Sequence, residues 1–259
     1  MIKFNKIVKA SKSWKKAKPF SHVIIDNFFD NKIAKQLESE FPDFDSKEWD
    51  NYNNAIEEKK ACNKWKVFPS LTYQTFQFLN SSTFVDKISN IFLGASALKP
   101  DSGLHGGGWH IHKRGGKLNT HLDYSMHPKL KLQRKINIII YLNSKWKKTW
   151  GGNLGFWGNK SYRSPGKLYK EIMPKFNRAV IFDTTQNSWH GLPNPINCPD
   201  KQYRKSLAVY YLIEPKKSTN KRSKVLFAPN EEQKKDKKVL DLIRKRSNMK
   251  SAASLYESR

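Results

Sequence analysis

The stretch Lys135-Ile-Asn-Ile-Ile-Ile-Tyr-Leu142 is the strongest strand signal in the chain. Its β-branched residues follow one another almost without interruption, which is typical of a strand that is buried on both faces. Shorter runs of the same character surround it and alternate with glycine-containing turns. These shorter runs predict strands at 109–112, 153–157, 178–182 and 206–213. Several short strands at this spacing predict a double-sheet jelly roll.

The residues before position 100 follow a helical pattern instead. Ile33, Leu37 and Phe41 fall at i, i+4 and i+8, and Pro42 ends this stripe. Similar stripes predict helices at 71–79 and 84–93, and one short apolar run predicts a strand at 22–26. Helices followed by strands indicate an α+β fold, with a double-stranded β-helix (jelly roll) core and N-terminal supporting helices.

These patterns divide the chain into four segments. They are a basic N-terminal arm (1–18), a mainly helical support region (19–100), the double-stranded β-helix core (101–213) and a Lys-rich C-terminal tail (214–259). We expect the arm to be poorly ordered and the tail to be mobile, apart from a short helix near 239–243. The polar stretches 43–66 and 158–170 are expected to be loops.

The net charge of +27 comes from 49 basic and 22 acidic residues and is spread along the whole chain. A diffuse lysine excess is typical of a protein encoded by an AT-rich genome. It is equally the pattern that attracts nucleic acid, acidic glycans or a membrane surface. No patch of interleaved arginine and aromatic residues favours the second interpretation, so nucleic acid is a partner suggested by charge alone.

Cys62 and Cys198 have no metal-type spacing, which favours free thiols in a reducing compartment. The basic N-terminus lacks the continuous apolar stretch of a signal peptide, and no window holds 18 apolar residues. We therefore expect a cytoplasmic protein without a membrane span.

The tripeptide His121-Leu-Asp123 and the distant His190 carry the chemistry. Residues i and i+2 of a strand share a face, so the first pair can point into the barrel together. His190 follows the expected strand at 178–182 and can join them. Two imidazoles and one carboxylate bind one face of an octahedral Fe(II) ion and leave the opposite face open for a chelating cosubstrate and O2.

A second group of residues predicts what that cosubstrate is. Arg204 offers a planar fork of donors that matches a carboxylate, and the Ser206 hydroxyl faces the same side. Tyr141, at the end of the apolar strand, can supply a phenol to the same carboxylate. 2-Oxoglutarate has the matching form, because its keto-acid end chelates a metal while its remote carboxylate provides an anchor.

Residues 105–212 resemble the prolyl 4-hydroxylase-like branch of the 2-oxoglutarate/Fe(II) dioxygenases. The resemblance is carried by Gly115-Gly-Lys-Leu-Asn-Thr-His121-Leu-Asp123, Asn137-Ile-Ile-Ile-Tyr-Leu-Asn143, Trp150-Gly-Gly-Asn-Leu154, Pro174-Lys-Phe-Asn-Arg178, Trp189-His-Gly191 and Arg204-Lys-Ser-Leu-Ala-Val-Tyr-Tyr-Leu212. It implies that His121, Asp123 and His190 bind iron and that Arg204 binds the distal carboxylate of 2-oxoglutarate. It also implies that Tyr141 is the phenolic partner of that carboxylate and that Leu154 forms an apolar wall.

The resemblance implies an enzyme that couples oxidative decarboxylation of 2-oxoglutarate to succinate with hydroxylation by O2, and an accessory need for ascorbate. The favoured substrates are a peptidyl proline, a free amino acid or a small metabolite. An oxygenase acting on nucleic acid or an anionic glycan remains an alternative, as does a jelly-roll binding protein without turnover. Neither the substrate nor the oligomeric state is readable from the motifs.

Five further side chains have two interpretations each. His112 is either part of the cosubstrate pocket or a core residue. His127 is interpreted first as a structural residue of a loop and second as a substrate contact. Arg134 either meets an anionic substrate or lies on the surface. Trp157 and Trp189 are candidates for the substrate wall, although a core position is favoured for Trp157.

Overall fold

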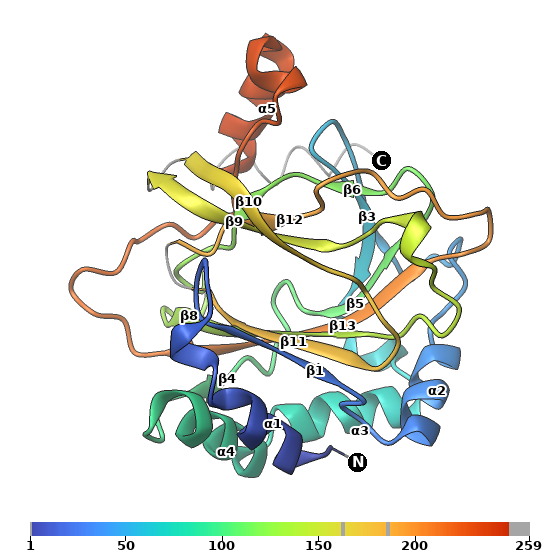
Figure 1. Cartoon of the computed structure of the whole chain (residues 1–259), viewed down its shortest axis with the longest axis vertical. Helices are drawn as coiled ribbons and strands as arrows, with labels where there is room; N and C mark the ends of the chain where they lie inside the picture. The colour runs from blue at the N-terminus through green and yellow to red at the C-terminus, as the bar shows by residue number, and fades with distance from the viewer. Residues whose placement is uncertain (1, 162–163, 185–186, 249–259) are drawn as a thin grey trace.

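The computed structural model describes residues 2–161, 164–184 and 187–248, which form two facing β-sheets with helices packed outside them (Figure 1). The major sheet has nine strands with the order β1-β11-β8-β13-β5-β3-β2, and β4 and β6 pair at its margins. The minor sheet has the order β10-β9-β12-β7-β14. The two sheets and the supporting helices confirm the expected α+β fold with a double-stranded β-helix core.

The strands of the major sheet are β1 (His22–Asp26), β2 (Asp50–Asn53), β3 (Glu57–Cys62), β4 (Lys99–Pro100), β5 (Gly108–His112), β6 (Lys117–Leu118), β8 (Gln133–Tyr141), β11 (Arg178–Asp183) and β13 (Arg204–Ile213). Those of the minor sheet are β7 (His121–Leu122), β9 (Leu154–Ser161), β10 (Ser164–Ile172), β12 (His190–Gly191) and β14 (Leu226–Phe227). The helices are α1 (Phe4–Ser11), α2 (Asn31–Ser39), α3 (Ser70–Leu79), α4 (Ser82–Leu93) and α5 (Lys237–Arg246), with four short 3-10 turns between them.

Strand β8 lies in the interior of the major sheet and accounts for the apolar run at 135–142. It pairs antiparallel with β11 on one side and β13 on the other. Its residues Ile136, Ile138 and Ile140 are fully buried and belong to the core beneath the helices. Asn137 and Ile139 face the space between the two sheets. The strand is therefore buried on both faces, as the run predicts.

Helices α1 to α4 cover the outer face of the major sheet, whereas α5 lies on the far side, beyond the minor sheet (Figure 1). The predicted helices at 71–79 and 84–93 correspond to α3 and α4. Ser81 caps α4 by accepting a hydrogen bond from the Phe84 amide, and Gly94 ends it in the left-handed conformation at φ 74°. This packing fixes the sheet from outside and leaves its inner face available for a site.

The N-terminal arm is folded, contrary to our expectation. It contains helix α1, whose Ile7 is fully buried, and the short turn Trp14–Lys16. The ring of Trp14 packs 4.6 Å from that of Phe92 on α4, measured between centroids. The apolar residues of this segment are separated by lysines and asparagine into runs of one or two, so they give no continuous signal.

The expected loops at 43–66 and 158–170 are also wrong, because both regions contain strands. The first forms the β2–β3 hairpin, which extends the major sheet beyond β5. The second contributes β10, which pairs with β9 through several register shifts and is exposed over most of its length. Strands with polar residues on both faces lack the alternation that sequence patterns detect.

The C-terminal segment is folded through residue 248 and is not a mobile tail. Strand β14 pairs with β7, and α5 begins at Asp236, whose side chain accepts hydrogen bonds from the amides of Lys238 and Val239. The expected short helix near 239–243 is confirmed. Residues 249–259 lie outside the described residues. The pairing of two-residue strands 100 positions apart has no local sequence signal.

Two expectations from composition agree with the structure. Cys62 and Cys198 are both buried and unpaired. Within the described residues, the helices are too short and too polar for any of them to cross a bilayer. The major sheet is completed by three strands that precede residue 100, namely β1, β2 and β3. We propose that residues 101–213 form the oxygenase core, which these flanking strands extend.

Candidate functional site

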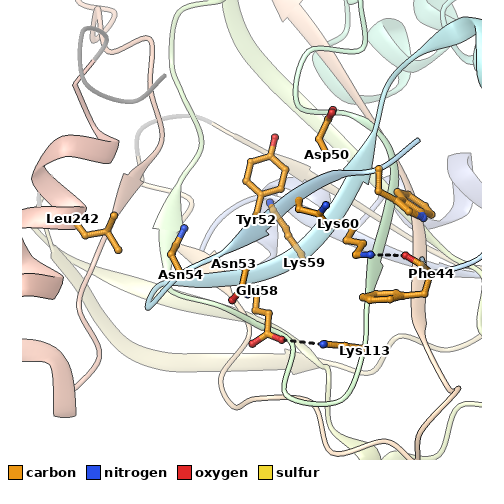
Figure 2. A pocket seen from close by; sticks show the side chains of 12 residues that line it. Phe44, Asp50, Tyr52, Asn53, Asn54, Glu58, Lys59, Lys60, Lys113 and Leu242 are labelled. Atoms are coloured by element: carbon orange, nitrogen blue, oxygen red, sulfur yellow. Dashed lines mark hydrogen bonds and ion pairs between the residues drawn. The ribbon is translucent and has the colours of Figure 1, made fainter. Parts of the chain in front are cut away.

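Two cavities meet between the sheets and the β2–β3 hairpin. The inner cavity, of about 440 Å³, is lined by six of the seven predicted site residues: His121, Asp123, Leu154, His190, Arg204 and Ser206. The outer cavity, of about 580 Å³, runs along the hairpin to Leu242 of α5 (Figure 2). Asp50, Tyr52 and Lys59 line both cavities, so the outer one leads into the inner one.

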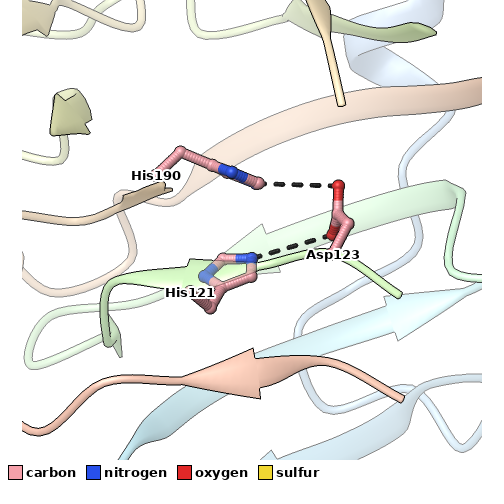
Figure 3. Close-up of side chains that lie close together, drawn as sticks. All are labelled: His121, Asp123 and His190. Atoms are coloured by element: carbon pink, nitrogen blue, oxygen red, sulfur yellow. Dashed lines mark ion pairs between the residues drawn. The ribbon is translucent and has the colours of Figure 1, made fainter. Parts of the chain in front are cut away.

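His121, Asp123 and His190 converge in the inner cavity (Figure 3). His121 and His190 are direct cross-strand partners on β7 and β12, which places their rings on the same face with centroids 4.3 Å apart. Asp123 follows β7 by one residue, and its two carboxylate oxygens lie 3.8 Å from the Nε2 atoms of His121 and His190 respectively. The three ligand atoms all lie within 4.8 Å of one another.

Backbone carbonyls fix the tautomer of both histidines. His121 Nδ1 lies 2.9 Å from the Asn119 carbonyl, and His190 Nδ1 lies 2.7 Å from the Ser188 carbonyl. A carbonyl only accepts, so Nδ1 carries the proton in each ring and the lone pair is on Nε2. Burial lowers the pKa of His121 to about 3, with a further contribution from His190, so this ring is neutral at pH 7. Both Nε2 lone pairs are therefore ready for a metal.

The carboxylate of Asp123 is buried, yet it remains charged. Burial alone would raise its pKa, but Arg134, together with His190, His121 and Lys59, outweighs that effect and the pKa is lowered. Arg134 Nη1 lies 3.4 Å from Asp123 Oδ1, and the guanidinium is held between the rings of Tyr124 and Tyr210, at 3.4 and 3.3 Å from their centroids. The side chain is 2% exposed, so the surface interpretation of Arg134 is wrong.

The residues present fit an iron ion. Asp123 Oδ2 is buried and has no hydrogen-bond partner among the described residues, although an unsatisfied buried carboxylate oxygen is costly. A metal would satisfy it together with the two Nε2 lone pairs. Two neutral imidazoles and one carboxylate are the donor set of non-heme Fe(II) oxygenases, with the remaining positions open.

Arg204 marks the other end of the inner cavity. Its side chain is 5% exposed, and among the described residues no carboxylate lies within 4.0 Å of it. Its Nε donates to the Gly152 carbonyl at 2.7 Å and its Nη2 to the Tyr141 hydroxyl at 3.2 Å. A buried guanidinium without a counter-ion is costly unless a ligand supplies one. The site therefore suits a carboxylate-bearing molecule.

The remaining predicted residues surround Arg204. Ser206 lies two residues along β13 on the same face, and Leu154 begins β9 on the opposite sheet. Tyr141 is fully buried but does not line the cavity, because its hydroxyl lies behind Arg204. His112 is the cross-strand partner of Arg204 and lines the cavity with both ring nitrogens unbonded. His127 does not line the inner cavity and lies 3.5 Å from Asp101.

The two tryptophans occupy different surroundings. Trp189 is fully buried and its indole nitrogen donates to the Asn159 side chain at 3.1 Å. Trp157 is partly buried and packs against the same small cluster as Trp189. Neither lines the inner or the outer cavity, so neither forms the substrate wall that the sequence suggested.

Sequence reasoning missed a clamp around Asp123 that comes from the C-terminal segment. Arg222 Nη1 donates to the carbonyls of Asp123 at 2.5 Å, Lys224 at 2.8 Å and Leu122 at 3.4 Å. The Arg222 carbonyl in turn accepts hydrogen bonds from the amides of Ser125 and Met126, at 2.8 and 2.9 Å. These bonds hold the backbone on both sides of Asp123. One arginine among many in this segment gives no signal from which the contact could be predicted.

Replacing Arg222 with glutamine is expected to weaken Fe(II) binding by about 10- to 100-fold, because supports outside the ligand set orient the ligands. The measurement is an anaerobic Fe(II) titration of wild-type and variant protein. The control is Lys221→Gln, which removes the same charge one residue away from the clamp. Equal Fe(II) affinity in all three proteins would show that the clamp does not orient Asp123.

Comparisons with known proteins place this geometry in a family. Residues 107–212 match the 2OG-Fe(II) oxygenase superfamily. Over 57 residues, or 22% of the chain, the sequence is 33% identical to a prolyl 3-hydroxylase from Xenopus laevis. That region spans only 11% of the relative's length.

Several solved structures share the fold. A prolyl 4-hydroxylase from Pseudomonas putida has a TM-score of 0.56 at 14% identity, covering 81% of this chain and 100% of that one. A prolyl hydroxylase from Trichoplax adhaerens, solved with a hypoxia inducible factor peptide fragment, has a TM-score of 0.53 at 17% identity, covering 81% and 88%. The matched region, residues 107–212, contains all three converging ligand residues. The chain therefore carries a domain of the 2OG-Fe(II) oxygenase superfamily.

Proposed function

We propose that this protein is an Fe(II)/2-oxoglutarate-dependent dioxygenase of the prolyl 4-hydroxylase-like type, which hydroxylates its substrate while converting 2-oxoglutarate to succinate. The observation that carries the proposal is the pairing of two sites in one cavity. Two imidazoles and a charged carboxylate converge at one end, and a buried arginine without a described counter-ion lies at the other. This arrangement suits a metal and a cosubstrate with a distant carboxylate.

Each side chain has a distinct part in this proposal. His121, Asp123 and His190 hold Fe(II), while Arg204 and Ser206 bind the distal carboxylate of 2-oxoglutarate. Leu154 forms an apolar wall beside it. Tyr141 orients Arg204 through the hydrogen bond from the guanidinium to its hydroxyl. The bound iron and cosubstrate supply the oxidation by O2, and ascorbate would serve as an accessory reductant.

The protein itself contributes a site from which bulk water is largely excluded. The three ligand residues are only 4–6% exposed, and the rings of Phe182 and Phe227 pack 5.0 and 5.3 Å from those of His190 and His121. Such surroundings strengthen every charge interaction at the metal and protect the oxidising state from side reactions.

A peptidyl residue is the substrate that the cavities favour. The outer cavity leads into the inner one, so a polymer can lie outside while one residue reaches the iron (Figure 2). The related Trichoplax adhaerens enzyme was solved with a peptide fragment. A free amino acid or small metabolite bound at the iron would leave the outer cavity unoccupied.

Two other proposals are compatible with parts of the sequence. The charge of +27 supports an oxygenase acting on nucleic acid or an anionic glycan. A jelly-roll binding protein without turnover would explain the fold, but it gives no reason for a buried Arg204 at the end of a complete ligand set. We also propose a cytoplasmic location, because both cysteines are unpaired.

Removal of the metal tests the proposed reaction. Protein treated with a chelator is expected to release no succinate from 2-oxoglutarate, and Fe(II) should restore the release whereas Zn(II) should not. Succinate is measured by mass spectrometry, with boiled protein as the control. Succinate release that survives the chelator, or that Zn(II) restores, would contradict an iron-dependent dioxygenase.

A further inference from the structure

Lys59 occupies the passage between the two cavities. It lies on β3, opposite Tyr52 of β2, and lines both cavities. Its side chain is 17% exposed, and its ammonium lies 5.2 Å from the centroid of the Tyr52 ring. A substrate that occupies both cavities would therefore lie beside this ammonium, which Figure 2 shows next to Tyr52.

The carboxylate nearest to Lys59 already has another strong partner. Within the described part of the chain, only Glu57 brings a carboxylate within 4.0 Å of the Lys59 ammonium, and that distance is 3.7 Å. Glu57 is 1% exposed and accepts a hydrogen bond from Arg246 Nε at 3.0 Å. Two basic groups thus share one buried carboxylate. Burial lowers the pKa of Lys59, and Glu57 only partly offsets this effect.

The charges around the inner cavity remain unbalanced after the cofactors are counted. Five basic residues line it: Lys59, Arg134, Arg204, Lys224 and Arg246. Three acidic residues line it: Asp50, Glu57 and Asp123. Fe(II) brings two positive charges and 2-oxoglutarate two negative ones, so the cofactors leave the surplus of two positive charges unchanged. An enclosed cavity of this kind favours a further anion.

We propose that Lys59 binds a carboxylate of the substrate, and that the substrate is a polypeptide with an acidic side chain close to the hydroxylated residue. This inference rests on the proposed function and names its substrate class. Arg204 is matched by 2-oxoglutarate, Arg134 by Asp123 and Arg246 by Glu57. Of the two basic residues that remain, Lys59 and Lys224, only Lys59 also lines the outer cavity. Lys59 is therefore the basic group left for the substrate.

The outer cavity fits a polypeptide better than a nucleic acid. It presents the side-chain amides of Asn51 and Asn53, which can hydrogen-bond to peptide groups. Two of its lysines already have partners, since Lys60 donates to the Phe44 carbonyl at 2.6 Å and Lys113 lies 3.9 Å from Glu58. Asp50 and Glu58 would repel a backbone with a charge at every nucleotide.

The test is a selection of random peptides displayed on phage, performed on the full-length protein loaded with Mn(II) and 2-oxoglutarate so that no turnover occurs. Wild-type protein is expected to enrich peptides with Asp or Glu at a fixed position. Lys59→Glu should reverse this preference towards Lys or Arg, and Lys59→Gln should weaken binding of the wild-type peptides by about 10- to 100-fold. The control Lys66→Gln removes the same charge from an exposed residue that lines neither cavity and should keep the acidic preference.

The outcomes separate this inference from the proposed function. Enrichment without acidic residues, no enrichment at all, or the same preference in wild type and both Lys59 variants would overturn the role of Lys59. Preferential capture of a single-stranded oligonucleotide in competition with the peptides would overturn the polypeptide substrate. If acidic peptides bind through Lys59 but gain no oxygen atom with Fe(II) and O2, the proposed function fails while Lys59 remains a carboxylate site.

Discussion

Replacing Asp123 with alanine is expected to abolish measurable Fe(II) binding and to lower succinate release by roughly 10³-fold or more, because the metal supplies several kcal/mol of the lowered barrier. Asp123 is the only charged ligand of the three, and its oxygens lie 3.8 Å from both ligand nitrogens. Its removal leaves only two imidazoles, which bind Fe(II) weakly. The measurement is succinate release under saturating Fe(II) and 2-oxoglutarate.

The control for this variant must separate loss of metal from loss of fold. Alanine also leaves the buried Arg134 without its carboxylate, which is destabilising. We therefore pair the variant with Asp123→Asn, which keeps the shape of the side chain, and measure thermal unfolding of both. Both variants should fold and lack turnover. Wild-type rates in a folded Asp123→Asn protein would mean that the carboxylate is not an iron ligand.

Replacing Arg204 with leucine is expected to raise the KM for 2-oxoglutarate by about 10²- to 10³-fold, since loss of one partner of a buried charge pair costs about 2–5 kcal/mol. The reason is that Arg204 is the one buried guanidinium at its end of the inner cavity among the described residues. Fe(II) binding in the absence of 2-oxoglutarate should change little, because the metal ligands lie at the other end.

The matched control for Arg204 is Lys205→Gln on the same strand. Lys205 Nζ donates to the Glu38 carbonyl on the outer side of the sheet and does not line the inner cavity. Its replacement should leave the KM for 2-oxoglutarate unchanged. An unchanged KM in the Arg204 variant as well would show that the cosubstrate carboxylate is held elsewhere.

The sequence was sufficient to predict the converging ligands for a physical reason. A strand alternates its side chains, so His121 and Asp123 share a face wherever that strand lies. The apolar run at 135–142 could only be a central strand, and the strand that starts at Arg204 had to pair within the same sheet. The structure confirms these strands and brings the three ligand residues together.

Arg134 could not be placed from the sequence because a bulge changes its direction. On β8, simple alternation puts Arg134 on the same face as Ile136, which faces the helices. The register with β13 shifts between Tyr211 and Leu212, so Lys135 has no direct partner and Arg134 turns towards the inner cavity. A one-residue irregularity of this kind has no composition signal.

The C-terminal contribution was missed because it depends on contacts between residues far apart in the chain. Arg222 binds the backbone of Asp123, and Arg246 binds the carboxylate of Glu57. A lysine-rich composition predicts a segment that is exposed to solvent. The hydrogen bonds of these two arginines depend instead on the tertiary fold, in which β14 pairs with β7. Lys59 was missed for the same reason, since its hairpin looked like a polar loop.

The central claim is that one cavity binds Fe(II) and 2-oxoglutarate together, and an anaerobic titration tests it most directly. Apo protein receives Fe(II) and then 2-oxoglutarate while the visible spectrum is recorded. We predict a weak charge-transfer band that appears only when both are present in wild-type protein and is absent in Asp123→Ala. A folded wild-type protein that develops no band would contradict the account, and the jelly-roll binding protein would then be the better description.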